Sequence, residues 1–138
     1  SSPRRQRQMC IRDSSKSVHT VSRLKEVEKI DLLYKNHEIF VQINIDNDPK
    51  KSGINLNDVQ KFFEKFENYS FFPNGIMCIP DINSDPRESF KNMNDINQKL
   101  LDNYKQYSGE LSMGMSADYK IALDYGATII RVGSKIFK

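Results

Sequence analysis

Residues 111–138, LSMGMSADYKIALDYGATIIRVGSKIFK, contain the pattern that decides the fold. They read as the end of a strand, a turn led by Ser116, a short helix over 117–125, and a second strand at 128–132. Gly126 follows the helix directly, and a glycine with positive φ is a common residue at that C′ position. A strand, a helix and a second strand in this order predict a parallel βαβ unit with a right-handed crossover.

The rest of the chain repeats the same alternation. Apolar and β-branched residues predict strands at 17–21, 38–45, 75–79, 110–115 and 128–132. Helices are predicted after Ser22, after Asn55, over a long segment with apolar residues from Phe90 to Tyr104, and over 117–125. In the strand at 38–45, Ile39, Val41, Ile43 and Ile45 share one face.

The helix after Asn55 has the clearest pattern. Val59, Phe62, Phe63 and Phe66 follow the i, i+3, i+4, i+7 spacing of one buried helix face. Asn55 is a good N-cap, and Ile54 and Val59 have the spacing of a hydrophobic staple.

Five strands and four helices in strict alternation predict an α/β fold with a parallel sheet. A doubly wound sheet and about five units of a (β/α)₈ barrel both satisfy this order. In a barrel, ligands bind at the carboxyl ends of the strands. The candidates at those ends are His19, Asn44, Met77, Ser116 and the pair Gly133-Ser134.

Ser116 and Gly133-Ser134 follow two neighbouring predicted strands. Their hydroxyls and backbone N–H groups would lie side by side, which favours a phosphate site. Arg131 lies in an otherwise apolar strand, and a buried arginine needs an anionic or polar partner. A plain N-cap role for Ser116 and a plain turn at 133–134 are the alternatives.

Length and composition narrow the class of protein. A chain of 138 residues with 38% hydrophobic residues and a mean hydropathy of −0.64 is a single polar-surfaced domain. It has neither an apolar run of about 20 residues nor a signal-peptide pattern, so we expect a cytoplasmic protein without a membrane partner.

Cys10 and Cys78 lack metal-site spacing, and Cys78 is interpreted as an inert buried thiol. The Asp and Asn residues at 46–48 and 81–85 are interpreted as solvated loops, because EF-hand spacing is missing.

The basic charge is confined to the N-terminus. Four of the seven arginines lie in the first twelve residues, and the chain after residue 15 has 17 basic and 17 acidic side chains. This balance argues against a nucleic-acid partner. The string RRQRQMCIRDS resembles a translated sequencing adapter. Residues 1–15 are therefore predicted to be a non-native or disordered tail, and residues 16–138 are predicted to be the domain. The alternative for residues 1–15 is a basic arm that binds an anionic partner.

Five segments together resemble the pyridoxal phosphate homeostasis proteins, relatives of the alanine racemase barrel domain. They are VHTVSRLK, VQINI with KKSG, GIMCIP, LSMGMSAD and GATIIRVGSKIF, in the family's order between residues 17 and 137. The resemblance implies part of a (β/α)₈ TIM-type barrel that binds pyridoxal 5′-phosphate and acts as a monomer.

The resemblance also implies which residues bind the cofactor. In these relatives a serine fifteen residues before an arginine contacts the phosphate, a separation that Ser116 and Arg131 share. The arginine lies beneath the pyridine nitrogen and keeps it unprotonated. Gly133 and Ser134 would offer N–H groups to the phosphate, and Met115 adjoins the serine. No catalytic residue is assigned.

The departures from the family are large. Its first three strands are missing, and with them the Schiff-base lysine, so cofactor binding is expected to be non-covalent. Lys51 matches another family lysine, and the chain ends at Phe137-Lys138 where the family continues. We therefore expect a product truncated at both ends.

Three functions stay open at this stage. The first is a homeostasis protein that holds and transfers the cofactor without known turnover. The second is a racemase-type enzyme, which needs a lysine base and a facing tyrosine that the sequence does not identify. The third is a cofactor-free module that binds another anion.

Overall fold

The computed structural model describes residues 18–23, 25–26, 38–69, 71–81, 83–132 and 135–137. Within these ranges, parallel strands lie in the order β1 (Val18–Val21), β2 (Glu38–Asn44), β4 (Gly75–Met77) and β5 (Glu110–Ser112). The two-residue β3 (Ile54–Asn55) pairs with β2 beside this path. A parallel bridge between Ser112 and Ile129 places the next segment beside β5. The predicted α/β fold with a parallel sheet is confirmed.

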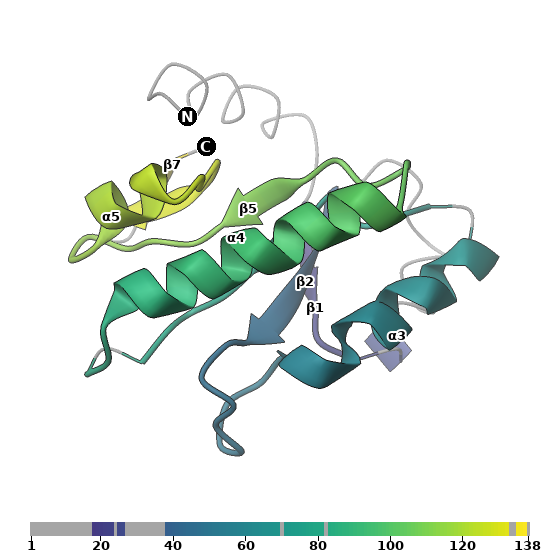
Figure 1. Cartoon of the computed structure of the whole chain (residues 1–138), viewed down its shortest axis with the longest axis horizontal. Helices are drawn as coiled ribbons and strands as arrows, with labels where there is room; N and C mark the ends of the chain where they lie inside the picture. The colour runs from purple at the N-terminus through teal and green to yellow at the C-terminus, as the bar shows by residue number, and fades with distance from the viewer. Residues whose placement is uncertain are drawn as a thin grey trace.

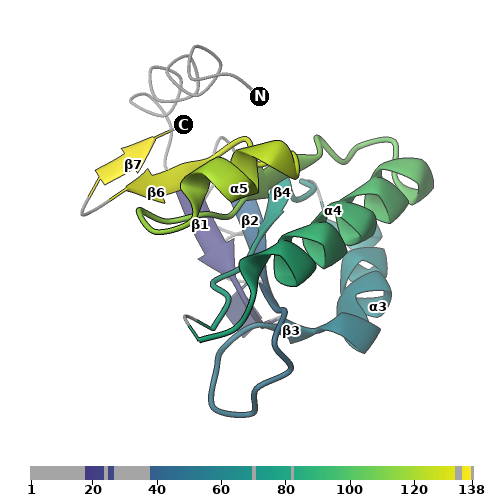
Figure 2. The ribbon, with the colours of Figure 1, turned by 60° about the vertical axis from the view of Figure 1, so that its left-hand side comes forward.

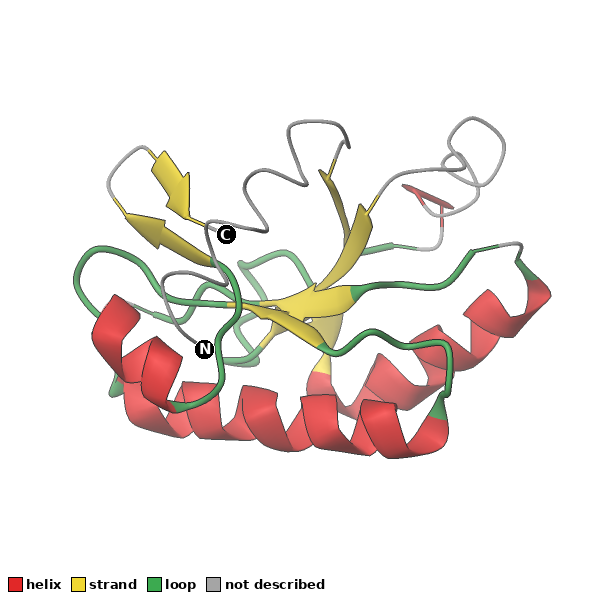
Figure 3. Cartoon of the chain, turned by 90° about the horizontal axis from the view of Figure 1, so that it is seen from above, coloured by secondary structure: helices red, strands yellow, loops and turns green. Residues whose placement is uncertain are grey.

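The order of the strands and the position of the helices identify the architecture. The helices α3 (Val59–Glu64), α4 (Pro86–Asn103) and α5 (Tyr119–Asp124) lie on one side of the sheet, as Figures 1 and 3 show. A doubly wound sheet has helices on both faces and reverses its strand order at a switch point. Strands in chain order with helices on one face are instead the arrangement of a barrel segment, whose ligand site lies at the carboxyl ends of the strands.

The core lies between the sheet and these helices. Val59, Phe62 and Phe63 of α3 are buried, as is Phe66 in the following 3₁₀ helix η2 (Lys65–Asn68). Alternate residues of β2 pack in the same cluster, together with Ile45 just after the strand; those of β2 are Ile39, Val41 and Ile43. Three residues form a second, smaller cluster on their own, namely Phe40, Met77 and Ile129. This division follows the alternation of side chains along a strand.

Local capping matches the sequence pattern. Asn55 caps the 3₁₀ helix η1 (Leu56–Asp58), because its side-chain oxygen accepts the Asn57 N–H at 3.0 Å. Gly126 has a φ of +96°. Its N–H donates to the Leu123 carbonyl, and the Ala127 N–H donates to the Ala122 carbonyl, a Schellman ending of α5. The predicted N-cap and the predicted C′ glycine are both confirmed.

One alternative failed, and one prediction was confirmed only in part. The short helix begins at Tyr119 with Asp118 at its N-cap position, so Ser116 lies in the preceding turn and does not cap the helix. The strand predicted at 128–132 stays beside β5 only at its start. Its later part, β6 (Ile130–Val132), pairs antiparallel with β7 (Lys135–Phe137), as Figure 2 shows. Two β-prone segments separated by a Gly-Ser pair are a hairpin pattern, and this pattern was missed.

Some predictions lie outside the described residues. These are the tail at 1–15 and most of the helix after Ser22, of which residues 25–26 are helical. The Ser22 N–H donates to the Glu26 carboxylate at 2.9 Å, as expected near a helix start. Among the described residues, no helix combines the length and the apolar character needed to cross a bilayer.

Changing Tyr107 to phenylalanine should lower the free energy of unfolding by about 1–3 kcal/mol, because a buried acceptor would lose its donor. The Tyr107 hydroxyl donates to Asn97 Oδ1, and both residues are at most 4% exposed. Asn97 in turn donates to the Gly109 carbonyl at 3.0 Å. The matched control is Tyr104→Phe, whose half-buried hydroxyl makes only a 3.4 Å contact with the Gln60 carbonyl. Urea unfolding of both variants checks this, and equal losses would contradict it.

Candidate functional site

The turn after β5 carries the predicted phosphate serine. Gly114 has a φ of +106°, which lets the chain leave the strand sharply at this point. The Met115 N–H then donates to Asp118 Oδ1 at 2.7 Å, and the Asp118 N–H donates back to the Met115 carbonyl at 3.0 Å. This reciprocal pair closes a tight turn that holds Met115 and Ser116 exposed beyond the strand end.

The segment that leads to Arg131 lies directly beside this turn. The Met113 N–H donates to the Ile129 carbonyl at 3.1 Å, and the Thr128 N–H donates to the Leu111 carbonyl at 2.8 Å. The structure therefore brings together the carboxyl end of β5 and the chain just before Arg131. The backbone of Arg131 lies in β6, paired with Ile136. Gly133 and Ser134 fall outside the described residues.

A narrow hollow lies between the carboxyl ends of β4 and β5. Its lining includes Met77, Cys78, Met113 and Met115. Cys78 is 4% exposed, and burial raises the pKa of its thiol to about 12, with smaller contributions from nearby Asp46 and Asp118. At neutral pH the thiol is therefore protonated and a poor nucleophile. This agrees with the interpretation of Cys78 as inert, and it leaves an apolar wall beside the Ser116 turn.

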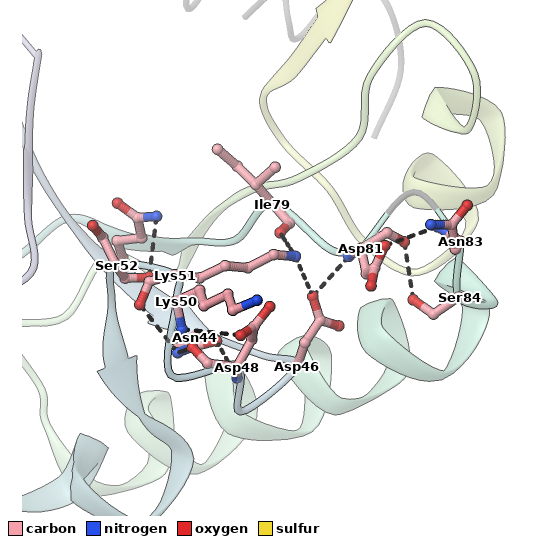
Figure 4. Close-up of polar contacts among 11 residues, drawn as sticks. Asn44, Asp46, Asp48, Lys50, Lys51, Ser52, Ile79, Asp81, Asn83 and Ser84 are labelled. Carbon is pink, nitrogen blue, oxygen red and sulfur yellow. Dashed lines mark hydrogen bonds and ion pairs between the residues drawn. The ribbon is translucent and has the colours of Figure 1, made fainter.

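A lysine lies at the carboxyl edge of the neighbouring strands. Lys51, in the loop after β2, donates to Asp46 Oδ2 at 2.7 Å (Figure 4). The same carboxylate oxygen accepts the Asp81 N–H from the loop after β4, also at 2.7 Å. Lys51 borders one hollow of about 280 Å³ with Gln42 and Asn44, and a second of about 500 Å³ with Arg23 and Glu26.

These contacts correct the interpretation of the two Asp- and Asn-rich loops as merely solvated. Asp46 joins the loops through Lys51 and the Asp81 N–H. Sequence reasoning also missed Asp118, which holds the Ser116 turn. A short Ser-x-Asp segment after a strand could have indicated this, because Asp often bonds nearby backbone N–H groups. In the described part of the chain, no three His, Cys, Asp or Glu side chains are grouped so as to hold a metal.

The hydrogen bond to Asp46 raises the pKa of Lys51, and the charges of Asp46, Asp81 and Asp48 act in the same direction. A pKa raised on folding means that the pair stabilises the fold at pH values below the ordinary lysine pKa. That contribution is lost as the pH rises through the raised value. Lys51 is therefore an ammonium ion at neutral pH.

Residues 3–138 match the family described as alanine racemase, N-terminal domain.

The chain belongs to this family.

Among its relatives, the pyridoxal phosphate homeostasis protein of Vibrio cholerae is 34% identical over 135 residues, covering 87% of this chain and 54% of the relative. The chain spans about half the length of the curated relatives it matches.

Solved structures agree with the family assignment. PipY of Synechococcus elongatus without PLP aligns with a TM-score of 0.76 at 26% identity, covering 87% of this chain and 60% of that one. A structure of PipY with PLP bound aligns with a TM-score of 0.74 at 22% identity, covering 100% of this chain and 67% of that one, and supports the fold. The resemblance inferred from the sequence is confirmed at the level of the alanine racemase N-terminal domain family.

Proposed function

We propose that this chain carries the phosphate-holding half of a pyridoxal 5′-phosphate site and binds the cofactor without a covalent bond. The observation that carries the proposal is the juxtaposition of the Ser116 turn with the segment before Arg131 at the carboxyl edge of the sheet. Relatives named pyridoxal phosphate homeostasis proteins and the PLP-bound PipY structure support the choice of ligand.

The donor chemistry of the turn fits a phosphorylated, partly apolar ligand. Ser116 is exposed, and a hydroxyl group suits a phosphate oxygen. Met115 beside it is 44% exposed, and its thioether side chain offers an apolar surface that suits the face of an aromatic ring. The carboxylate of Asp118 opposes a phosphate by like charge. However, it lies within the turn and is hydrogen-bonded to the Met115 N–H.

Each residue then has a distinct role. Ser116 would donate its hydroxyl to the phosphate, Gly133 and Ser134 would donate backbone N–H groups, and Met115 would cover one side of the ligand. By the family resemblance, Arg131 would interact with the pyridine nitrogen and keep that nitrogen unprotonated. When bound, the cofactor supplies an aldehyde that reacts with amines. The chain itself acts by binding, orienting and releasing it, most simply as a monomer.

The proposal that these 138 residues bind the cofactor without a covalent bond rests on their lysines. None of the fourteen follows a first barrel strand, the position of the family's Schiff-base lysine. Borohydride reduction followed by peptide mapping should therefore find no dominant pyridoxyl-lysine. Stoichiometric labelling of one lysine would contradict this part of the proposal.

The binding site is tested by Ser116→Ala. Loss of one hydrogen bond of about 0.5–1.5 kcal/mol should raise the Kd for pyridoxal 5′-phosphate roughly two- to thirteenfold. Equilibrium dialysis measures this for the wild-type chain and the variant. Ser84→Ala is the control, because its hydroxyl donates to the Asp81 carbonyl in the loop after β4. An unchanged Kd in Ser116→Ala would place the site elsewhere, and no binding by the wild-type chain would contradict the proposed function.

A further inference from the structure

The carboxylate of Asp46 joins two loops at the carboxyl edge of the sheet. One oxygen, Oδ2, accepts both the Lys51 ammonium and the Asp81 N–H, each at 2.7 Å (Figure 4). Asp46 and Lys51 are five residues apart, whereas Asp46 and Asp81 are 35 apart. The contact therefore fixes the loop after β2 against the loop after β4. A second contact, from Lys51 Nζ to the Ile79 carbonyl at 3.5 Å, ties the lysine to the end of β4.

The backbone of the Lys51 loop is held independently. The Asn44 side chain donates to the Asp48 carbonyl at 2.7 Å and accepts the Asp48 N–H at 3.2 Å. It also lies 3.4 Å from the Lys51 carbonyl, to which it donates. The loop is thus folded onto the end of β2 without any contribution from the Asp46 carboxylate. A change of charge at Asp46 should leave this backbone arrangement in place.

The surroundings of the Lys51 ammonium are mainly anionic. Asp46 and Asp48 face it from its own loop, and Asp81 faces it from the loop after β4. Arg23 and Glu26, from the segment after β1, border the same hollow. The side chains of Lys51 and Asp46 are 32% and 16% exposed, so the pair is half-buried and still reachable by a small ligand.

We propose that Asp46 is a positioning residue that fixes the Lys51 side chain as an ammonium ion between the loops after β2 and β4, so that Lys51 does not act as an amine nucleophile toward a phosphorylated aldehyde. That such an aldehyde is the ligand rests on the proposed function. The position of Lys51 rests on its contacts with Asp46 and with the Ile79 carbonyl.

Amine acylation reports this charge state directly. In the reaction with acetic anhydride, the lone pair of the neutral amine forms a C–N bond, acetate leaves, and the nitrogen loses a proton. An ammonium ion has no lone pair and does not react. Trace labelling of the intact 138-residue chain, with peptide mapping between pH 7 and pH 11, therefore gives the titration of each lysine without any cofactor.

In the wild-type chain, Lys51 should be labelled more slowly than exposed Lys99 at pH 8–9, and the midpoint of its titration should lie at a higher pH.

The variant Asp46→Asn keeps an oxygen for the Asp81 N–H. In this variant, labelling of Lys51 at pH 8 should rise about three- to tenfold, because each unit of lowered pKa gives about ten times more neutral amine. Asp48→Asn is the matched control. It makes the same charge change in the same loop, where Asp48 bonds the Lys50 N–H, and its effect should be below about twofold.

Two outcomes would overturn the proposal: labelling of wild-type Lys51 as fast as Lys99, or an Asp46→Asn profile identical to that of Asp48→Asn. If Asp46→Asn failed to fold, the wild-type comparison of Lys51 with Lys99 would still decide. Because acylation needs no cofactor, this result is separate from the dialysis test. A chain that does not bind pyridoxal 5′-phosphate can still show the Lys51 profile. A chain that binds the cofactor can equally fail to show it.

Discussion

Replacing Phe63 with alanine should lower the free energy of unfolding by about 3–5 kcal/mol, the range for removing a fully buried phenylalanine ring. Phe63 is 0% exposed. Its ring meets Tyr107 edge-on at a centroid distance of 5.5 Å, and the rings of Phe66, Phe72 and Tyr104 lie within 6.1 Å. Deleting the ring leaves a cavity at the junction of α3, η2 and the segment after α4, which these neighbours cannot fill without moving.

Urea unfolding followed by far-UV circular dichroism measures this loss. Phe71→Ala is the matched control, because Phe71 belongs to the same aromatic cluster and is only half-buried. Its ring meets Phe66 edge-on and Tyr69 at a tilt. Its loss should be clearly smaller. Equal losses in the two variants would show that Phe63 is not the centre of this core.

The sequence predicted those parts of the fold that local rules determine. The buried face of α3 follows from the spacing of Val59, Phe62 and Phe63, because a helix has a fixed period. The two faces of β2 follow from strict alternation. Gly126 ends α5 because only a residue that tolerates positive φ fits a Schellman motif. In each case one segment contains all the information.

Features that depend on distant contacts could not be predicted in the same way. The contact of Asp46 with the Asp81 N–H joins residues 35 apart in the sequence, and an Asp-rich loop looks solvated until its partner is known. The choice between a barrel segment and a doubly wound sheet required the strand order and the side on which the helices pack. Alternation of strands and helices satisfies both folds.

The residues assigned to the candidate site stay a prediction, and the structure adds how the turn that carries Ser116 is built. Ser116 does follow the strand that ends beside Ile129. Its position, however, depends on Gly114 and on the carboxylate of Asp118, which sequence reasoning left out. The helix-capping alternative for Ser116 failed because Asp118, two residues later, occupies the N-cap position.

The second large effect is expected from Gly114→Ala, which should both destabilise the fold and weaken binding of pyridoxal 5′-phosphate. Gly114 has a φ of +106°, which side-chain-bearing residues rarely adopt. A Cβ at this position would lie 2.7 Å from Ala122 Cβ and 3.3 Å from Ile130 Cγ2. Backbone strain and overpacking each cost about 1–3 kcal/mol, so a total of about 2–6 kcal/mol is expected.

Gly126→Ala separates these two causes. Gly126 has a similar φ of +96°, yet a Cβ there would come no closer than 3.6 Å to Asn94 Oδ1. This variant should therefore lose only the cost of strain, about 1–3 kcal/mol. Gly126 lies at the far end of α5 from Ser116, so its substitution should leave the Kd for pyridoxal 5′-phosphate unchanged.

In Gly114→Ala, the turn must move away from Ala122 to relieve the overlap, and Ser116 moves with it. We expect the Kd to rise by at least as much as in Ser116→Ala, because the whole turn that presents the hydroxyl is displaced and not one donor alone. Equilibrium dialysis, at a temperature where all variants remain folded, compares Gly114→Ala, Ser116→Ala and Gly126→Ala with the wild-type chain. If Gly114→Ala lost stability but bound the cofactor like the wild-type chain, the turn after β5 would be a structural element only. The phosphate site would then have to be sought elsewhere at the carboxyl edge of the sheet.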